Sequence, residues 1–321
     1  MIGHMTVLDK FLEGDQAALA RIISFIEDRG EGYQEVLSRL YPRSGKAIKI
    51  GFTGPPGAGK SSLVNNVTRI LASSGKKVGV IAVDPSSPFT GGALLGDRIR
   101  LIDMPIDGSV YIRSMATRGS TGGLAAATGN VTIALDAFGF DYILLETVGV
   151  GQVELDIIDT CDTVIVVLVP ESGDAIQAMK AGLMEIADIF AINKADRPGS
   201  ENIVAELNMI LEIKREKIDW ELPVIATEAI NNKNTDRLLE KIGAHIEYEK
   251  SSGRFENRRR EQIRKKIYSI LQYHLSNLIK DKLNGLVNLD KVVSDIYEGK
   301  SDPYTISQKL LELSELKSDQ K

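Results

Sequence analysis

The segment Gly-Pro-Pro-Gly-Ala-Gly-Lys-Ser at residues 54–61 fits the phosphate-binding (Walker A) pattern G-x-x-x-x-G-K-[ST] without a mismatch. Its glycines allow the backbone to curl so that N–H groups point at phosphate oxygens, and a following helix adds a favourable dipole. We expect the Lys60 ammonium to reach the β- and γ-phosphates of a nucleotide and the Ser61 hydroxyl to ligate Mg²⁺. The predicted nucleotide contacts of this loop are Gly54, Pro55, Pro56, Gly57, Ala58, Gly59, Lys60, Ser61 and Ser62.

A second motif, "NKAD" at residues 193–196, follows an apolar segment and predicts which base is bound. The Asp196 carboxylate can accept from both the N1–H and the 2-amino group of guanine, whereas adenine would leave it unpaired. This asymmetry is worth roughly 2–4 kcal/mol. Lys194 can lay its aliphatic stem on the base, and Asn193 can tie loops together. The segment "ATEA" at 226–229 could close the base pocket through backbone N–H groups, which adds Thr227, Glu228 and Ala229. The guanine nucleotides GTP and GDP are therefore favoured over ATP.

The segment "ETVG" at 146–149 has the form E-x-x-G where small GTPases have D-x-x-G. We expect Glu146 to hold Mg²⁺ through water or to approach the attacking water, and the Gly149 N–H to meet the γ-phosphate. The next residue is Val150, where a Ras-type enzyme carries its water-orienting Gln, and Gln152 comes two positions late. Slow hydrolysis is therefore predicted, which suits a timed conformational switch better than a pump.

Two further segments that follow predicted strands carry candidate site residues. Residues 83–100 are rich in Gly, Pro and Ser, and their Asp84 and Asp97 complete a predicted metal set of Ser61, Asp84, Asp97 and Glu146. Three arginines could stabilise charge, with a surface ion pair as the alternative for each: Arg98, Arg113 and Arg118. In segment 170–188, Gln177 and Lys180 share one helical face, and an exposed helix is the alternative. The predicted catalytic set is Lys60, Asp97, Glu146, Gln177 and Lys180.

Apolar segments that alternate with helical patterns predict the frame for these residues. We expect strands at 47–53, 77–84, 108–114, 141–146, 163–170, 189–196 and 222–229, and helices at 62–74 and 123–138. Continuous apolar strands separated by helices indicate an α/β P-loop NTPase fold, with a mostly parallel sheet covered by helices on both faces. The candidate residues then gather at the carboxyl ends of the strands. Residues 8–41 and those from 236 onward are predicted helical extensions.

The C-terminal extension carries an apolar row at helical spacing: Ile263, Ile267, Ile270, Leu271, His274 and Leu278. This row exceeds what a lone surface helix needs to cover, so we predict a homodimer through this part of the chain. The basic run "RFENRRREQIRKK" at 254–266 is interpreted as a solvated helix face.

Composition narrows the function classes. The chain has 321 residues and a net charge of −5, so no nucleic-acid partner is expected. No apolar run approaches the roughly 20 residues that a membrane span needs. Cys161 is the only cysteine, which rules out an intrachain disulfide and favours a reducing, cytoplasmic location. The three histidines are scattered, so no cluster of metal ligands is visible beside the nucleotide motifs.

The segments "GPPGAGKSS", "VDPSSPFTGGALLGDRIR", "RSMATRGSTGGLA", "ETVGVGQ" and "EIADIFAINKAD" together resemble the MeaB/ArgK family, which includes the methylmalonic aciduria type A protein. The resemblance runs from about residue 10 to 280. It implies a homodimeric GTPase chaperone that gates adenosylcobalamin loading into a cobalamin-dependent acyl-CoA mutase, typically methylmalonyl-CoA mutase, and protects or reactivates it. Partner-stimulated hydrolysis with Mg²⁺ is also implied.

The same resemblance implies three parts: an N-terminal helical segment at 1–45, a G domain at 46–250 and a C-terminal dimerisation arm with a tail at 251–321. It also implies that Gln177 and Lys180 lie in an additional switch near the partner. Three alternatives remain open at this point. They are a kinase or ATPase that serves arginine/ornithine (LAO/AO) transport, a metal-insertion GTPase and a signal-recognition GTPase.

Overall fold

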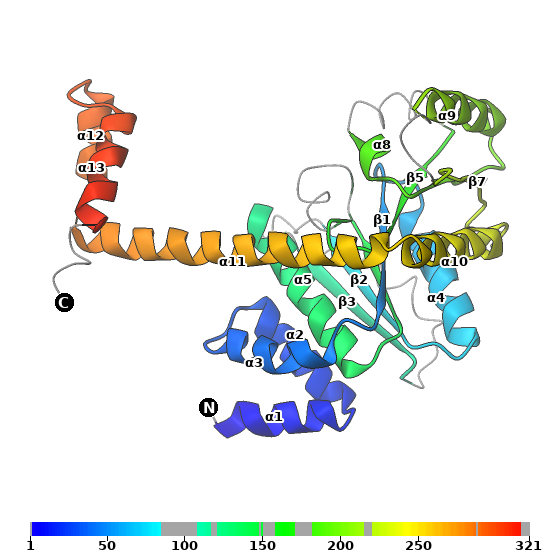
Figure 1. Ribbon diagram of the computed structural model, residues 1–321, viewed down its shortest axis with the longest axis horizontal. Coiled ribbons are helices and arrows are strands. Elements are labelled where there is room, and N and C mark those ends of the chain that lie inside the picture. Colours follow the sequence, from blue (N-terminus) through cyan, green and yellow to red (C-terminus); the bar gives the residue numbers. More distant parts are fainter. Residues whose placement is uncertain are drawn as a thin grey trace. The chain divides into compact units, whose positions relative to one another are not determined.

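A computed structural model (Figure 1) describes residues 2–84, 108–116, 121–147, 149, 158–170, 182–214, 220–286 and 288–315. The chain divides into two compact units, Met1–Arg259 and Arg260–Lys321. The first unit contains the sheet and both nucleotide motifs. The second contains most of helix α11 (Arg254–Leu286) and the helices α12 (Leu289–Tyr297) and α13 (Pro303–Glu315). The domain limits predicted at residues 45 and 250 stay a prediction.

Among the described residues, seven strands form one parallel sheet in the order β3-β2-β4-β1-β5-β6-β7. The strands are β1 (Ile48–Thr53), β2 (Val78–Asp84), β3 (Val110–Ala116), β4 (Tyr142–Glu146), β5 (Thr163–Leu168), β6 (Ile189–Ile192) and β7 (Val224–Ala226). Each strand starts within two residues of the start that was predicted from the sequence. The parallel α/β arrangement predicted from the continuous apolar segments is confirmed.

The strands are apolar on both faces because each face is covered by helices (Figure 1). Successive strand residues alternate between two cores: Val164 and Val166 belong to one, and Ile165 and Val167 to the other. Helices α4 (Lys60–Ser73) and α10 (Thr235–Ser251) contribute to the second core. The first core includes residues of α5 (Thr121–Phe138), α8 (Leu183–Ile186) and α9 (Ser200–Lys214). Within the described helices, none is both long and apolar enough to cross a bilayer.

The N-terminal helices extend the first core instead of forming a separate one. They are α1 (Ile2–Leu12), α2 (Gln16–Glu27) and α3 (Tyr33–Leu40), followed by the 3₁₀ turn η1 (Tyr41–Arg43). The rings of Phe11 and Phe138 of α5 form a T-shaped pair at a centroid distance of 5.1 Å. Arg113 of β3 forms an ion pair with Glu27 of α2, with Nε 3.0 Å from Oε2. The geometry therefore favours the ion-pair alternative for Arg113 over charge stabilisation at the nucleotide.

A buried aspartate of α5 fixes the chain where it enters β1. The Asp136 side chain is only 3% exposed. Its carboxylate accepts from three successive backbone N–H groups, those of Gly45 (2.6 Å), Lys46 (3.0 Å) and Ala47 (3.0 Å). Several N–H donors compensate the cost of burying a carboxylate. Asp136 therefore determines how the strand that precedes the phosphate loop starts.

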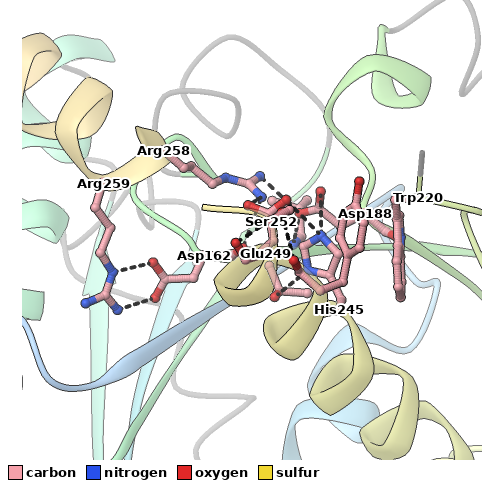
Figure 2. Close-up of polar contacts among 11 residues, drawn as sticks. Asp162, Asp188, Trp220, His245, Glu249, Ser252, Arg258 and Arg259 are labelled. Atoms are coloured by element: carbon pink, nitrogen blue, oxygen red, sulfur yellow. Dashed lines mark hydrogen bonds and ion pairs between the residues drawn. The ribbon is translucent and has the colours of Figure 1, made fainter. Parts of the chain in front are cut away.

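The same amino-terminal end of the sheet carries an ionic cluster that joins strand starts to the first turns of α11 (Figure 2). Asp162 precedes β5 and is 1% exposed. It receives two bonds of 2.8 Å from Arg259, in the bidentate geometry that suits a guanidinium and a carboxylate. Arg258 donates to the Asp162 carbonyl and to the Asp188 carboxylate, both at 3.0 Å. Two members of the basic run are thus paired, and its interpretation as a solvated face is wrong for them.

The cluster continues through His245 of α10 (Figure 2). Its Nδ1 lies 3.0 Å from the Thr163 hydroxyl, and its Nε2 lies 3.4 Å from Asp188. Burial lowers the pKa of His245 although the Asp188 carboxylate opposes this effect. Trp220 donates its indole N–H to the Asp188 carbonyl at 3.0 Å. These contacts attach the end of α10 and the start of α11 to the amino ends of β5 and β6.

The Arg259 pair yields a stability prediction with a matched control. Arg259→Met should lower the free energy of unfolding by roughly 3 kcal/mol, because it leaves the buried Asp162 carboxylate without its cation. Arg260→Met changes the same residue type at the next position, where the side chain is exposed, and should cost less than about 0.5 kcal/mol. Urea unfolding curves of both variants measure the difference. Equal curves would mean that the pair contributes nothing to the fold.

Candidate nucleotide-binding site

The predicted nucleotide motifs meet at the carboxyl ends of the strands. The phosphate loop connects β1 to α4, and β1 is hydrogen-bonded to β4 and β5 on its two sides. Phe52 of β1 is in register with Glu146, the last residue of β4. Asn193 directly follows β6, and Thr227 directly follows β7. The parallel topology therefore brings three motifs that are far apart in the sequence to one edge of the sheet.

Two glycines of the phosphate loop have no room for a side chain. Gly54 has φ +139°, and a Cβ added to it would lie 2.0 Å from the Val167 carbonyl oxygen. Gly59 has φ +88°, and its added Cβ would lie 2.1 Å from the Asn193 amide nitrogen. Both conformation and space therefore require glycine here. The Lys60 ammonium donates to the carbonyls of Gly54 (2.9 Å) and Pro55 (3.0 Å), so it contacts the phosphate loop directly.

The predicted metal residues Ser61 and Glu146 contact one another. The Ser61 hydroxyl at the start of α4 donates to Glu146 Oε1 at 2.5 Å. A hydroxyl and a carboxylate are hard oxygen donors, and Mg²⁺ is commonly bound by one or two protein oxygens together with phosphates and waters. The pair fits that ion. Asp84 ends β2, but its side chain lies outside the described residues.

Asn193 links the phosphate loop to the segment after β7. The side chain is 2% exposed. Its Nδ2 donates to the Ala58 carbonyl at 2.8 Å, and its Oδ1 accepts from the Ala229 N–H at 3.0 Å and from the Thr227 hydroxyl at 3.3 Å. Lys194 follows with φ +56°, an uncommon conformation for a residue with a side chain. No local pattern in the sequence indicates that backbone conformation.

Of the residues predicted to contact the base, Thr227 and Ala229 are buried, and Lys194 and Glu228 are partly buried. Asp196 is exposed. The backbone N–H groups of Thr227, Glu228 and Ala229 donate to Ile192 O, Lys233 O and Asn193 Oδ1. Their predicted contact with a base stays a prediction. The Glu228 carboxylate accepts from Lys233 at 2.6 Å and from Asn231 at 3.2 Å, and these bonds lower its pKa.

Gly149 lies beside the phosphate loop, since a Cβ added to it would be 3.6 Å from Pro56. Its carbonyl accepts from the hydroxyls of Thr53 (3.1 Å) and Thr147 (3.3 Å). Neither threonine was predicted from the sequence. A polar residue at the end of an otherwise apolar strand was the available signal for Thr53. These bonds attach the E-x-x-G segment to the end of β1.

Several predicted residues lie outside the described part of the chain. These are Asp97, Gln177 and Lys180 of the predicted catalytic set, with Arg98, Arg118, Val150 and Gln152. Within the described residues, no group of three or more His, Cys, Asp or Glu side chains could hold a metal ion.

The position of Asp196 at the strand edge yields a specificity prediction. Asp196→Asn should weaken GTP binding and favour xanthosine triphosphate, because the amide presents a donor where the guanine amine would be. Asp236→Asn, at an exposed position in the first turn of α10, is the matched control and should leave both affinities unchanged. Competition binding with GTP, ATP and xanthosine triphosphate measures the change. Equal ATP and GTP affinities in the wild type would contradict the assignment of residues 193–196.

Comparisons with known proteins place the chain in a family. The family described as "Methylmalonyl Co-A mutase-associated GTPase MeaB" matches residues 19–284. A relative from Pyrococcus abyssi is 45% identical over 311 residues, which cover 95% of each chain. The methylmalonic aciduria type A homolog of Caenorhabditis briggsae is 30% identical over 323 residues, 91% of this chain and 78% of its own.

Among solved structures, one described as "Crystal structure of LAO/AO transport system kinase" superposes with a TM-score of 0.68 at 26% identity, covering 97% of each chain. The family match spans the whole sheet, the phosphate loop and residues 193–196, so it includes the site described above. The chain therefore belongs to the MeaB family of GTPases.

Proposed function

We propose that this GTPase serves a cobalamin-dependent acyl-CoA mutase, gates its loading with adenosylcobalamin and protects or reactivates it. The observation that carries the proposal is the family match, whose description names association with methylmalonyl-CoA mutase. The methylmalonic aciduria type A homolog among the relatives supports the same role. The proposed cytoplasmic location rests on the lone, buried Cys161, which is in its thiol form because burial raises its pKa to about 12.

The geometry of the site supports a timed switch. Ser61 of the phosphate helix bonds to Glu146, and Thr53 and Thr147 bond to the Gly149 carbonyl. The E-x-x-G segment is thus attached through Glu146 to the first turn of α4 and through Gly149 to Thr53 at the end of β1. When bound by Ser61 and Glu146, Mg²⁺ would neutralise phosphate charge during hydrolysis. Asp84 and Asp97 complete the proposed metal set.

A partner that binds one nucleotide state more tightly must shift the nucleotide equilibrium by the same free energy. The segments proposed to carry this coupling are 85–97, 147–153 and 171–182, which follow β2, β4 and β5. All three strands end at the nucleotide edge of the sheet, so the presence of one γ-phosphate can bias all of them.

A second candidate is a kinase or ATPase of LAO/AO transport. It is favoured by the solved LAO/AO transport system kinase, which superposes over nearly the whole chain. The two functions differ in the nucleotide. A carboxylate at Asp196 favours guanine, whereas a transport kinase of this kind would use ATP. The metal-insertion alternative has no comparable observation in its favour.

The chaperone proposal predicts a partner effect on rate. Alone, the enzyme should turn over far below the ~1–100 s⁻¹ typical of kinases, and methylmalonyl-CoA mutase should accelerate GTP hydrolysis severalfold or more. Gln177→Ala and Lys180→Ala should reduce this stimulation and leave basal hydrolysis nearly intact, whereas Glu240→Ala on the exposed side of α10 should change neither. GTPase rates with and without mutases, paired with cofactor transfer, are the measurement. The proposal fails if no cobalamin-dependent mutase alters either rate.

The apolar row of α11 supports a homodimer in which a second copy covers it. Ile263, Ile267, Ile270, Leu271 and Leu278 are each 44–54% exposed. Such a row of large apolar side chains is uncommon on a monomer surface.

Ile267→Glu combined with Leu271→Glu in the full chain should therefore dissociate the dimer, because the two carboxylates would be buried in the contact. Ser269→Glu with Gln272→Glu adds the same charge on other faces of the helix and should preserve the dimer. Light scattering at several protein concentrations gives the mass of each species. An intact dimer in the first variant would put the interface elsewhere.

A further inference from the structure

We propose that Asn66 is a positioning residue that holds the base-binding segment 227–229 at a fixed distance from the phosphate-binding helix. The proposal concerns the guanine-nucleotide site of the GTPase itself and is independent of any mutase partner. Asn66 is outside the sequence motifs for phosphate, metal and base, and it lies on α4, six residues after Lys60.

The burial of Asn66 demands a polar partner. The side chain is 7% exposed and lies on a helix whose Leu63, Val64 and Val67 are almost completely buried. An amide in such surroundings is costly unless it is hydrogen-bonded. Its Nδ2 donates to the Ala229 carbonyl at 2.7 Å, across 163 residues of sequence. The bond therefore connects the helix of the phosphate loop to the segment that follows β7.

Asn66 and Asn193 hold the same residue from two sides. The Ala229 carbonyl accepts from Asn66, and the Ala229 N–H donates to Asn193 Oδ1 at 3.0 Å. Asn193 in turn donates to the carbonyl of Ala58, two residues before α4 begins. The contacts close a ring that runs from α4 through Ala229 and Asn193 to Ala58 and back to α4.

The ring also includes the segment that carries Asp196. The Ala195 N–H donates to the Thr227 carbonyl at 3.0 Å, and the Thr227 N–H donates to Ile192 O at 2.8 Å. The position of the guanine-recognition carboxylate relative to the phosphate loop thus depends on the segment that Asn66 holds. A nucleotide contacts both regions at once, so a fixed spacing lowers the ordering cost of binding.

Affinity for a ligand that lacks a base distinguishes this positioning role from a general contribution of Asn66 to the stability of the fold. A frame that spaces the base pocket from the phosphate loop should matter for GDP and GTP but not for tripolyphosphate, which contains phosphates only. Loss of helix stability would weaken all three ligands together or none of them.

The test compares two variants of Asn66 with a control on the same helix. Asn66→Leu removes the amide and keeps a similar volume, and Asn66→Asp keeps the shape and replaces the donor by an acceptor. Thr68→Val is the control, because the Thr68 hydroxyl is also buried and bonds to Val64 of its own helix, at 2.7 Å. If the leucine variant fails to fold, Asn66→Asp, which retains the size of the side chain, still provides the test.

We expect both Asn66 variants to bind GDP and GTP about 10-fold more weakly, the factor that one lost buried donor produces. Tripolyphosphate affinity and the hydrolysis rate at saturating GTP should stay within about twofold of the wild type, and Thr68→Val should match the wild type in all four values. Fluorescent-GDP displacement and single-turnover hydrolysis measure them. Unchanged GDP affinity in Asn66→Asp, or an equal loss for GDP and tripolyphosphate, would overturn the proposal.

Discussion

The buried amide of Asn193 needs a hydrogen-bond partner for both its nitrogen and its oxygen. These two partners belong to different segments of the chain. Its nitrogen bonds to Ala58 of the phosphate loop, and its oxygen bonds to Ala229 after β7. The same amide nitrogen occupies the space where a Cβ on residue 59 would lie, so it also requires Gly59. One side chain thereby links the phosphate loop to the segment after β7 and restricts the sequence of the loop.

The polar side chains at the two ends of the parallel sheet make different kinds of contact. At the carboxyl ends, polar side chains bond to loops, and Asp196 is exposed. At the amino ends, Asp162 and Asp188 are saturated by arginines and backbone N–H groups, including those of Lys49 and Val164. The ionic cluster of Figure 2 therefore has a structural role in attaching the first turns of α11, at the edge of the sheet opposite the nucleotide motifs.

The fold and the motifs could be predicted from the sequence because both depend on local patterns. Continuous apolar segments specify buried parallel strands, and residues 54–61 and 193–196 have fixed spacing. Arg259 and Asn66 could not be assigned, because each finds its partner about 100 or more residues away and nothing local distinguishes a paired arginine from a solvated one. The φ of +56° at Lys194 could not be predicted either, because no local pattern in the sequence indicates it.

The described contacts also explain how the occupancy of the phosphate site could reach the rest of the protein. The Thr147 hydroxyl lies 3.1 Å from the Thr53 hydroxyl, and Thr53 donates to the Gly149 carbonyl, while Ser61 bonds to Glu146. These bonds form a short path from the first turn of α4 to the E-x-x-G segment. Mg²⁺ held by Ser61 and Glu146 would compete with the serine proton for the Glu146 carboxylate, so their mutual bond would weaken. In the proposed switch, the positions of Glu146 and Gly149 would therefore depend on what the phosphate loop holds.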